Sequence, residues 1–457
     1  MWVEPDFIFR SLKCFSFSPL CKGLHTLKLK GYSFHWVMSI LISLPFVGVS
    51  NVNGLSKYIQ AGKDVFYRLK NNPGINWRYI LWLFACKFVK LTRDERDSGQ
   101  VKCLIFDDTV LQKTGKFIEK VSMVWDHVRN SWVLGYKLLV MGYWDGTSMI
   151  PLDLSLHREE GKNKSKPYGL RKKDLRRQFN KKRQSGTHSS DRAKETDESK
   201  ISVMLKMFKR AISHGLKVDY VLVDSWFTCE ALINAVAGVK NQCVHLIGMY
   251  KIAKTQFTFR AKQQTYAQIR NQLGRPKRCR SLKLYYLQAD VQYKGHKLQL
   301  FYSKIGKNGK WKTILTTDTS ISFIRLIEIY QIRWSIEVFF KESKQLLSLG
   351  SCQSNNFDAQ IADLTITMIQ YILLTFRYRF DVYQSKSGMY EKVKDEIEIQ
   401  KLNERLWGLF IELMQLLTNI IEHDDEMQGL IKLINDGRIL ERLAQILKTD
   451  QHEQNAA

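Results

Sequence analysis

The segment 320–349 restricts the possible folds of this 457-residue chain more than any other stretch. Its apolar residues recur at helical spacing, which predicts one long amphipathic helix with one face against a core. That buried face holds Ile332, Ile336, Phe339 and Leu346. The other face holds Tyr330, Arg333, Glu337 and Lys344, which fall within roughly 60° of one another at about 3.6 residues per turn. A phenol, two cations and a carboxylate in one row suit a phosphate backbone beside a metal ion.

Two other segments place aspartate directly after an apolar run that is typical of a buried strand. They are CLIFDDTVLQKTG (103–115) and DYVLVDSWFTCEAL (219–232). We expect each strand to end at its aspartate, so that Asp107 and Asp224 project from one edge of a sheet. Asp108 is the alternative to Asp107, because the two are adjacent in the chain.

Each carboxylate taken alone has an ordinary structural explanation. An aspartate before Ser or Thr often caps a helix or starts a turn, and Glu337 could pair with Lys341 at i+4. The order Asp, Asp, Glu together with the Tyr, Arg and Lys spacing favours one shared site over separate structural roles. Convergent carboxylates can hold two divalent ions about 3.5–4 Å apart, which activate a water and stabilise a leaving 3′ oxygen.

The pattern Tyr-x2-Arg-x3-Glu-x6-Lys, joined to the two strand–aspartate segments, resembles bacterial insertion-sequence transposases of the DDE type. The resemblance covers residues 50–380, and the spacing from Asp107 to Leu111 also fits the Asp-x3-Leu pattern of that family. It implies a ribonuclease-H-like core in which Asp107, Asp224 and Glu337 bind Mg2+ or Mn2+, with two ions in the site, and catalyse strand cleavage and strand transfer.

The same resemblance implies DNA contacts outside the carboxylates. Tyr330, Arg333 and Lys344 would hold phosphates near the cleaved end. Trp311 would stack on a flipped base, as an aromatic residue does in relatives that form hairpin intermediates. The alternative for Trp311 is a core tryptophan of the β-rich segment that surrounds it.

The charge balance independently predicts a polyanionic partner. Lys and Arg number 71 against 44 Asp and Glu, which gives a formal net charge of +27. Nucleic acid is the first expectation and an anionic membrane surface the second. The segment 162–183 holds eleven of these cations and one acidic residue, Asp174. It is either a solvated loop or a phosphate-binding one.

Two further features of the sequence bear on the cellular compartment in which the protein acts. The most apolar run, 36–49, contains Pro45 and is too short to span a membrane, so we expect a buried helix there rather than a signal peptide. The eight cysteines include no Cys-x2-Cys pair, which argues against a zinc site and suits a reducing cytoplasm.

The expected fold is α/β: a ribonuclease-H-like mixed sheet with an all-β insertion, flanked by N- and C-terminal helical regions. The expected parts are a basic helical region at 1–95 that contacts DNA or braces the core, the first part of the core at 96–249 with a basic loop at 158–200, the β insertion at 250–318, the last part of the core at 319–380, and a helical region at 381–457.

The expected function is a DNA transposase that acts in the bacterial cytoplasm on double-stranded DNA, without a membrane partner. It would bind the inverted-repeat ends of its own element as a homodimer, cut them, and join them to target DNA. The alternatives are a catalytically inactive DNA-binding protein derived from such an enzyme and a stand-alone metal-dependent nuclease.

Overall fold

The computed structural model describes residues 29, 31–47, 62–92, 99–252 and 254–380. Its centre is a mixed sheet in which β3 pairs antiparallel with both β1 and β4, while β1, β5 and β6 run parallel. A further strand, β2, pairs with the start of β3. The bounds of these strands are β1 Cys103–Gln112, β2 Ser122–Asp126, β3 Ser131–Trp144, β4 Met149–His157, β5 Tyr220–Val223 and β6 His245–Tyr250.

Consecutive apolar residues explain why β1 and β5 are the central strands. Residues 103–106 and 221–223 are fully buried, as expected for parallel strands covered on both faces. The helices α8 (Lys200–Ser213) and α9 (Glu230–Ala237) connect β4 to β5 and β5 to β6. β5 confirms the strand predicted to end at Asp224.

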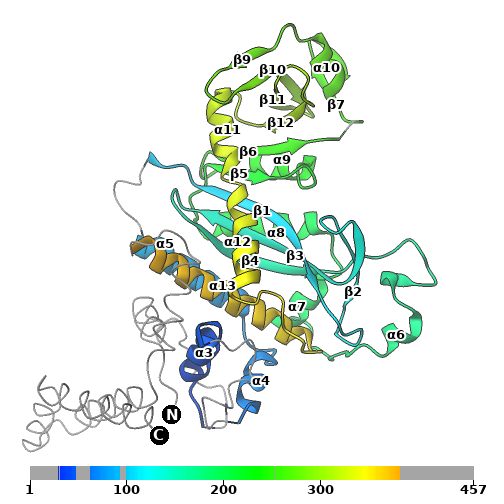
Figure 1. Ribbon diagram of the computed structural model, residues 1–457, viewed down its shortest axis with the longest axis vertical. Coiled ribbons are helices and arrows are strands. Elements are labelled where there is room, and N and C mark those ends of the chain that lie inside the picture. The colour runs from blue at the N-terminus through cyan, green and yellow to red at the C-terminus, as the bar shows by residue number, and fades with distance from the viewer. Residues whose placement is uncertain (1–28, 30, 48–61, 93–98, 253, 381–457) are drawn as a thin grey trace, which may run out of the picture.

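Helices from the two ends of the described chain pack against the sheet at β4. The long helix α13 (Phe357–Phe380) lies beside α5 (Trp77–Thr92), and both pack on β4 (Figure 1). α3 (Phe34–Ser43), η1 (Leu44–Val47) and α4 (Asp64–Lys70) lie near them. Burial of the predicted apolar run 36–49 is confirmed for residues 37–44; residues 48 and 49 fall outside the described ranges.

One helix in the described part of the chain is long and apolar enough to cross a membrane. It is the segment Phe357–Arg379 of α13, and 89% of its most apolar window is buried inside the protein. Such burial is typical of a core helix.

The segment from 256 to 316 extends the central sheet. Its last strand, β12 (Lys312–Thr316), pairs antiparallel with β6, so the described strands form one 12-stranded sheet. The other strands are β7 Gln256–Phe259, β8 Lys262–Thr265, β9 Lys277–Cys279, β10 Leu284–Tyr293 and β11 His296–Ile305. A tight turn at Lys294-Gly295 joins β10 to β11, and both residues have the positive φ that such a hairpin needs.

The all-β prediction for this insertion is wrong at one place. Residues Tyr266–Gln272 form the helix α10, because Thr265 and Gln268 make a reciprocal capping box at its start. The alternating pattern on either side of this short helix hid it.

The single helix predicted over 320–349 is also wrong. Two helices, α11 (Phe323–Gln331) and α12 (Trp334–Leu346), are separated at Ile332 and Arg333. Backbone N–H groups here donate three residues back rather than four, from Arg333 to Tyr330 and from Ser335 to Ile332. This tighter turn breaks the helix while the chain keeps its direction (Figure 1).

A third correction concerns the end of β1. The strand continues to Gln112 rather than stopping at Asp107, because β3 pairs with it from Cys103 to Gln112. The neighbouring strand β5 pairs with β1 only as far as Phe106. The edge of β1 that faces β5 is therefore unpaired from Asp107 onward.

The segment 158–200 is only partly the exposed excursion that was predicted. It contains η4 (Pro167–Gly169), α6 (Lys172–Arg176) and α7 (His188–Glu195). Arg183 is buried and pairs with Glu119 at 2.6 Å and with Asp358 at 3.3 Å. Lys181 also pairs with Asp358, at 2.7 Å. The remaining cations of 162–183 are exposed: Lys162, Lys164, Lys166, Arg171, Lys172, Lys173, Arg176, Arg177 and Lys182.

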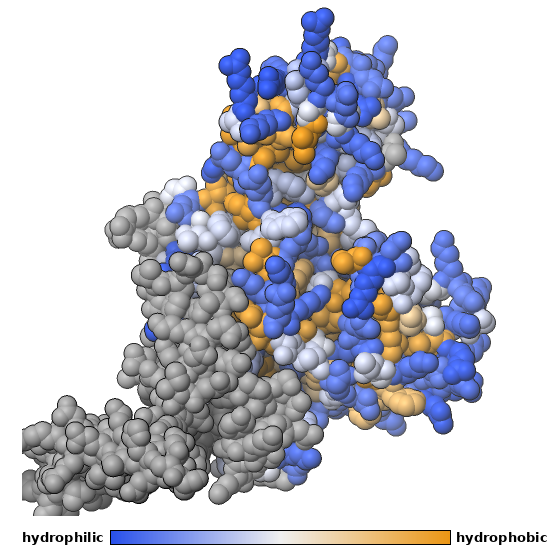
Figure 2. All heavy atoms as spheres, viewed as in Figure 1, coloured by the Kyte–Doolittle hydropathy of each residue, from blue (hydrophilic) through white to orange (hydrophobic). Residues whose placement is uncertain are grey.

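Figure 2 shows hydrophilic side chains gathered at the outer end of the β insertion and around the protruding segment that carries α6. The predictions for 381–457, and most of those for 1–61, fall outside the described residues. The six cysteines within the described ranges are free: Cys86, Cys103, Cys229, Cys243, Cys279 and Cys352.

Candidate active site

Asp107, on β1, and Asp224, the residue directly after β5, lie side by side. The register pairs Phe106 with Val223, so each aspartate is the next residue along its own strand direction. The negative charge of Asp224 acts on Asp107 strongly enough to contribute to raising the pKa of that carboxyl. Two segments 117 residues apart therefore deliver carboxylates to one edge, as the sequence predicted.

Arg333 links the first aspartate to the glutamate of α12. Its guanidinium donates to Asp107 Oδ2 at 3.1 Å and to Glu337 Oε1 at 2.6 Å. The side chains of Arg333 and Asp107 are 14% and 16% exposed, whereas that of Glu337 is 35% exposed. Glu337 is thus the more accessible of the two carboxylates that Arg333 joins.

Burial raises the pKa of Asp107 to about 7. The charge of Arg333 and the backbone N–H of Asp108 oppose this rise, while Asp224 and Asp108 add to it. Because a carboxyl with such a pKa keeps its proton up to near neutral pH, a second cation at this edge would favour its charged form. Perturbation of this kind is common at functional sites.

Asp224 both organises a turn and belongs to the site. Its Oδ1 accepts the backbone N–H of Trp226 at 2.8 Å and that of Phe227 at 3.1 Å. The hydroxyl of Thr228 donates to the Asp224 carbonyl at 2.7 Å. The structural role of Asp224 that the sequence suggested is therefore present. Both backbone N–H groups bind Oδ1, so Oδ2 takes no part in this turn.

Asp108 points away from this group. Its Oδ2 accepts from Lys200 Nζ at 2.7 Å, at the start of α8. Alternate residues of a strand face opposite sides of a sheet, so Asp107 and Asp108 meet different elements. The geometry favours Asp107 over Asp108 as the partner of Glu337.

Tyr330 and Lys344 lie at the two ends of the row. The Tyr330 hydroxyl donates to the carbonyl of Val223 at 3.2 Å, and burial raises its pKa to about 12. Lys344 Nζ donates to Thr109 Oγ1 at 2.7 Å and to the Val110 carbonyl at 3.2 Å. Tyr330 thus attaches α11 to β5, and Lys344 attaches α12 to β1.

Trp311 is not part of this group. It precedes β12 in the insertion, is half-buried against the hydrophobic core, and has Lys304 Nζ 4.8 Å from its ring centroid. No contact joins it to the three carboxylates within the described residues.

The donor set suits a hard divalent cation, although the carboxylates do not converge on one point. Within the described ranges no group of three or more His, Cys, Asp or Glu lies close enough to hold a metal ion. The Arg333 guanidinium stands between Asp107 and Glu337 and supplies the positive charge there. Oxygen ligands from two strands and one helix match what Mg2+ and Mn2+ prefer.

Sequence reasoning missed Lys200 and Trp226. Lys200 pairs with Asp108 and lies 4.0 Å from the ring centroid of Trp226, which is 51% exposed. The signal for Trp226 was present, because it stands two residues after Asp224. Lys200 gave none, since its partner is 92 residues away.

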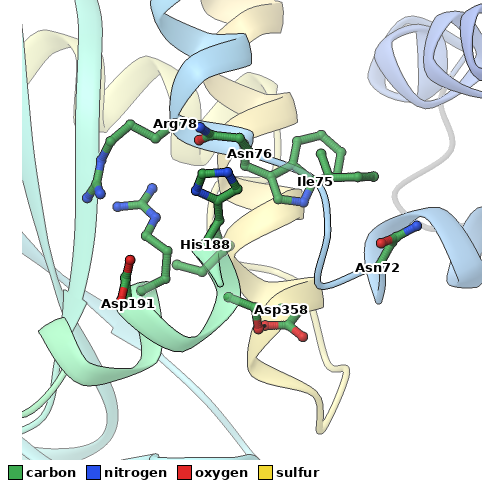
Figure 3. A pocket seen from close by; sticks show the side chains of 11 residues that line it. Asn72, Ile75, Asn76, Arg78, His188, Asp191 and Asp358 are labelled. Atoms are coloured by element: carbon green, nitrogen blue, oxygen red, sulfur yellow. Dashed lines mark hydrogen bonds between the residues drawn. The ribbon is translucent and has the colours of Figure 1, made fainter. Parts of the chain in front are cut away.

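A separate polar cavity lies where α5, α7 and α13 meet (Figure 3). Arg78, Asn76, His188, Asp191 and Asp358 surround it (Figure 3). None of the predicted site residues lines it. Its surroundings are crossed by ion pairs between these helices and β4, which marks it as a structural junction.

Comparison with known proteins agrees with the geometry. Residues 102–373 match the family described as "Transposase DDE domain". The match begins just before β1 and ends within α13, so it includes all three carboxylates and the insertion. A comparison with curated proteins finds no significant match.

Proposed function

The chain belongs to the transposase DDE domain family, and we propose that it binds the inverted-repeat ends of its own insertion sequence, cuts them and joins them to target DNA. The observation that supports this best is the pair of ion pairs made by Arg333. They connect a carboxylate of the central strand to one on α12, directly beside Asp224.

We further propose that the core is ribonuclease-H-like. Support comes from the strand order β4-β3-β1-β5-β6, in which β3 is antiparallel to β1 while β5 and β6 are parallel to it. The first aspartate on the central strand and the second on its parallel neighbour also fit that fold. The β insertion separates Asp224 from Glu337, as the resemblance implies.

Asp107, Asp224 and Glu337 would hold Mg2+ or Mn2+, with two ions in the site. Such ions activate a water and stabilise the leaving 3′ oxygen of a phosphodiester. Asp107 and Asp224 are held rigidly by the sheet and by the turn at 224–228. Glu337, the more exposed of the two carboxylates that Arg333 joins, can turn toward Asp107 and Asp224 when Arg333 takes a DNA phosphate instead.

DNA contacts in this proposal come from Tyr330, Arg333 and Lys344 near the cut end and from Trp311 on the insertion. Residues 1–95 and 381–457 would help to bind DNA or to form a homodimer on the paired ends. In this proposal the protein acts in the bacterial cytoplasm, on the chromosome.

An inactive DNA-binding protein derived from a transposase is the competing candidate. The observation in its favour is that, among the described residues, no three His, Cys, Asp or Glu side chains lie close enough together to hold a metal ion. A stand-alone nuclease is less well supported, because the basic segment and the β insertion exceed what simple strand cutting requires.

Strong salt dependence of DNA binding is the first expected outcome. Arg176 and Arg177 are exposed, at the end of α6. Changing both to Gln should reduce the slope of log affinity against log salt by up to about 1.8, since each phosphate contact contributes about 0.9. The measurement is binding of labelled element-end fragments over a series of salt concentrations.

The matched control removes the same charge from α8, where Lys206 and Lys209 are also exposed. Changing that pair to Gln should leave the slope nearly unchanged. If the α6 variant has the wild-type slope, the basic segment does not contact DNA, and DNA binding must be assigned elsewhere.

A further inference from the structure

A groove of about 590 Å3 lies beside the candidate active site, along the part of β1 that follows Asp107. Residues 108–112 of β1 line one side, the tip of the β2–β3 hairpin at 126–129 lines another, and the turn at 348–351 closes the end. Lys137 and Lys344 also line it. Five strand residues extend about 13 Å between the first and the last, which matches roughly four nucleotides of one strand at 3.4 Å each.

Lys137 is the unusual residue in this groove. It is only 4% exposed, on β3 beside Val110 of β1. Its ammonium group makes no hydrogen bond or ion pair with any residue that the structure describes. Covering so much of a lysine that has no partner is costly. Because its ammonium still lines the groove rather than being fully enclosed, an anion bound in the groove can supply the missing partner.

The other charges of the groove do not supply that anion. Asp108 forms an ion pair with Lys200 at 2.7 Å. Asp126 accepts the backbone N–H of Val128 at 2.9 Å and lies 3.8 Å from Arg129 Nε. Lys344 donates only to neutral oxygens of Thr109 and Val110. Two lysines therefore face the groove without a carboxylate partner in the described part of the chain.

We propose that this groove binds the phosphate backbone of the DNA strand next to the scissile phosphate, with Lys137 as the phosphate ligand at its floor. The inference rests on the proposed function, because DNA is chosen from the place of the groove: Lys344 of the candidate site lines it, and it begins one residue after Asp107 on β1. Arg129 at the hairpin tip, whose side chain is 59% exposed, contacts the same strand from the rim. None of these residues belongs to the Tyr-Arg-Glu-Lys row except Lys344.

The first test compares Lys137→Met with Lys240→Met. Met keeps the length of the lysine stem without its charge, and Lys240 is an exposed lysine just after α9. Lys137→Met should weaken binding of element-end DNA about 5- to 10-fold at 0.1 M salt and reduce the salt slope by about 0.9. Lys240→Met should change neither.

Thermal unfolding of the same variants separates a ligand role from a structural one. Removing an unpartnered buried charge should leave the melting temperature of Lys137→Met unchanged or raise it. A melting temperature several degrees below that of wild type would show that Lys137 supports the fold and would overturn the proposal. So would wild-type affinity with a wild-type salt slope.

The second test locates the DNA phosphate that Lys137 contacts. End fragments carry a single uncharged methylphosphonate at successive positions on each side of the cut. Wild type should lose affinity at one to three consecutive positions on one side. At one of these, Lys137→Met should lose nothing further, because the contact is already absent. If the affinity lost through Lys137→Met and the affinity lost through the methylphosphonate add together at every position, the proposal is overturned.

Strand cleavage with Mg2+, scored in the same reactions, keeps this inference distinct from the proposed function. If wild type cleaves the DNA but the affinity losses are additive at every position, DNA binding in the groove is refuted and the transposase proposal stands. Binding without cleavage but with the non-additive position supports the groove and refutes catalysis.

Discussion

Asp107→Asn, Asp224→Asn and Glu337→Gln are each expected to bind element-end DNA and to lose its cleavage. Each change keeps the shape of the side chain and removes the charge that a divalent ion needs. Cleavage with Mg2+ or Mn2+ should fall by at least about 10²- to 10³-fold, the size of effect that follows removal of one stabilising group from an active site. Affinity should stay the same or rise slightly, because repulsion between carboxylate and phosphate is relieved.

Asp108→Asn is the matched control, because it removes the same charge one residue away. Asp108 pairs with Lys200 rather than Arg333, so this variant should cut normally. A gel assay on one set of end fragments measures binding and cutting together. If Asp108→Asn fails to cut and Asp107→Asn cuts normally, the choice between the adjacent aspartates is wrong.

Arg333→Ala is expected to have the second large effect, on both stability and cleavage. The change leaves Asp107 and Glu337 without their shared cation, close to Asp224. Breaking a fully buried pair costs about 3–5 kcal/mol, and partial exposure here reduces that to about 1–3 kcal/mol. Mg2+ should restore part of the lost stability, because it can neutralise the same carboxylates.

On DNA, Arg333→Ala should weaken end binding about tenfold and should cut slowly or at displaced positions, because the fork that holds a phosphate is gone. Arg325→Ala is the control: Arg325 is an exposed residue of α11 whose ion-pair partner among the described residues is Glu328, at 3.1 Å. Denaturant unfolding with and without Mg2+, followed by the end-fragment assay, measures both effects. An Arg333→Ala variant with wild-type stability and wild-type cutting would separate Arg333 from the site.

Much of the site could be predicted because its signals are local. Unbroken apolar runs before Asp107 and Asp224 indicated buried strands, and buried strands of one sheet bring their ends together. The hairpin at Lys294-Gly295 was also local, since its turn requires positive φ. These features depend on residues that are neighbours in sequence.

The errors arose where distant partners decide the structure. β1 extends beyond Asp107 because β3, beginning at Ser131, continues to pair with it. Arg183 is buried because Glu119 and Asp358 supply its counter-charges from 64 and 175 residues away. The break at Arg333 escaped notice because a tight turn hardly shifts the helical phase of the apolar residues around it.

That Lys137 is buried and unpaired also could not be predicted from the sequence, because distant residues decide it. In the sequence it is one of many lysines within a strand. The pairing of β3 with both β1 and β4 is what buries it, and the surrounding side chains show that no carboxylate from the described ranges reaches it.

The most direct test is strand cleavage by the unaltered chain. Purified protein is incubated with the terminal fragments of the element that encodes it, with Mg2+, with Mn2+ and with EDTA. The proposal predicts nicks that leave a 3′ hydroxyl at the element end with either metal, none with EDTA, and joining of that end to added target DNA. Tight binding to the same fragments with no cut under either metal would contradict it and would identify a DNA-binding protein that has lost catalysis.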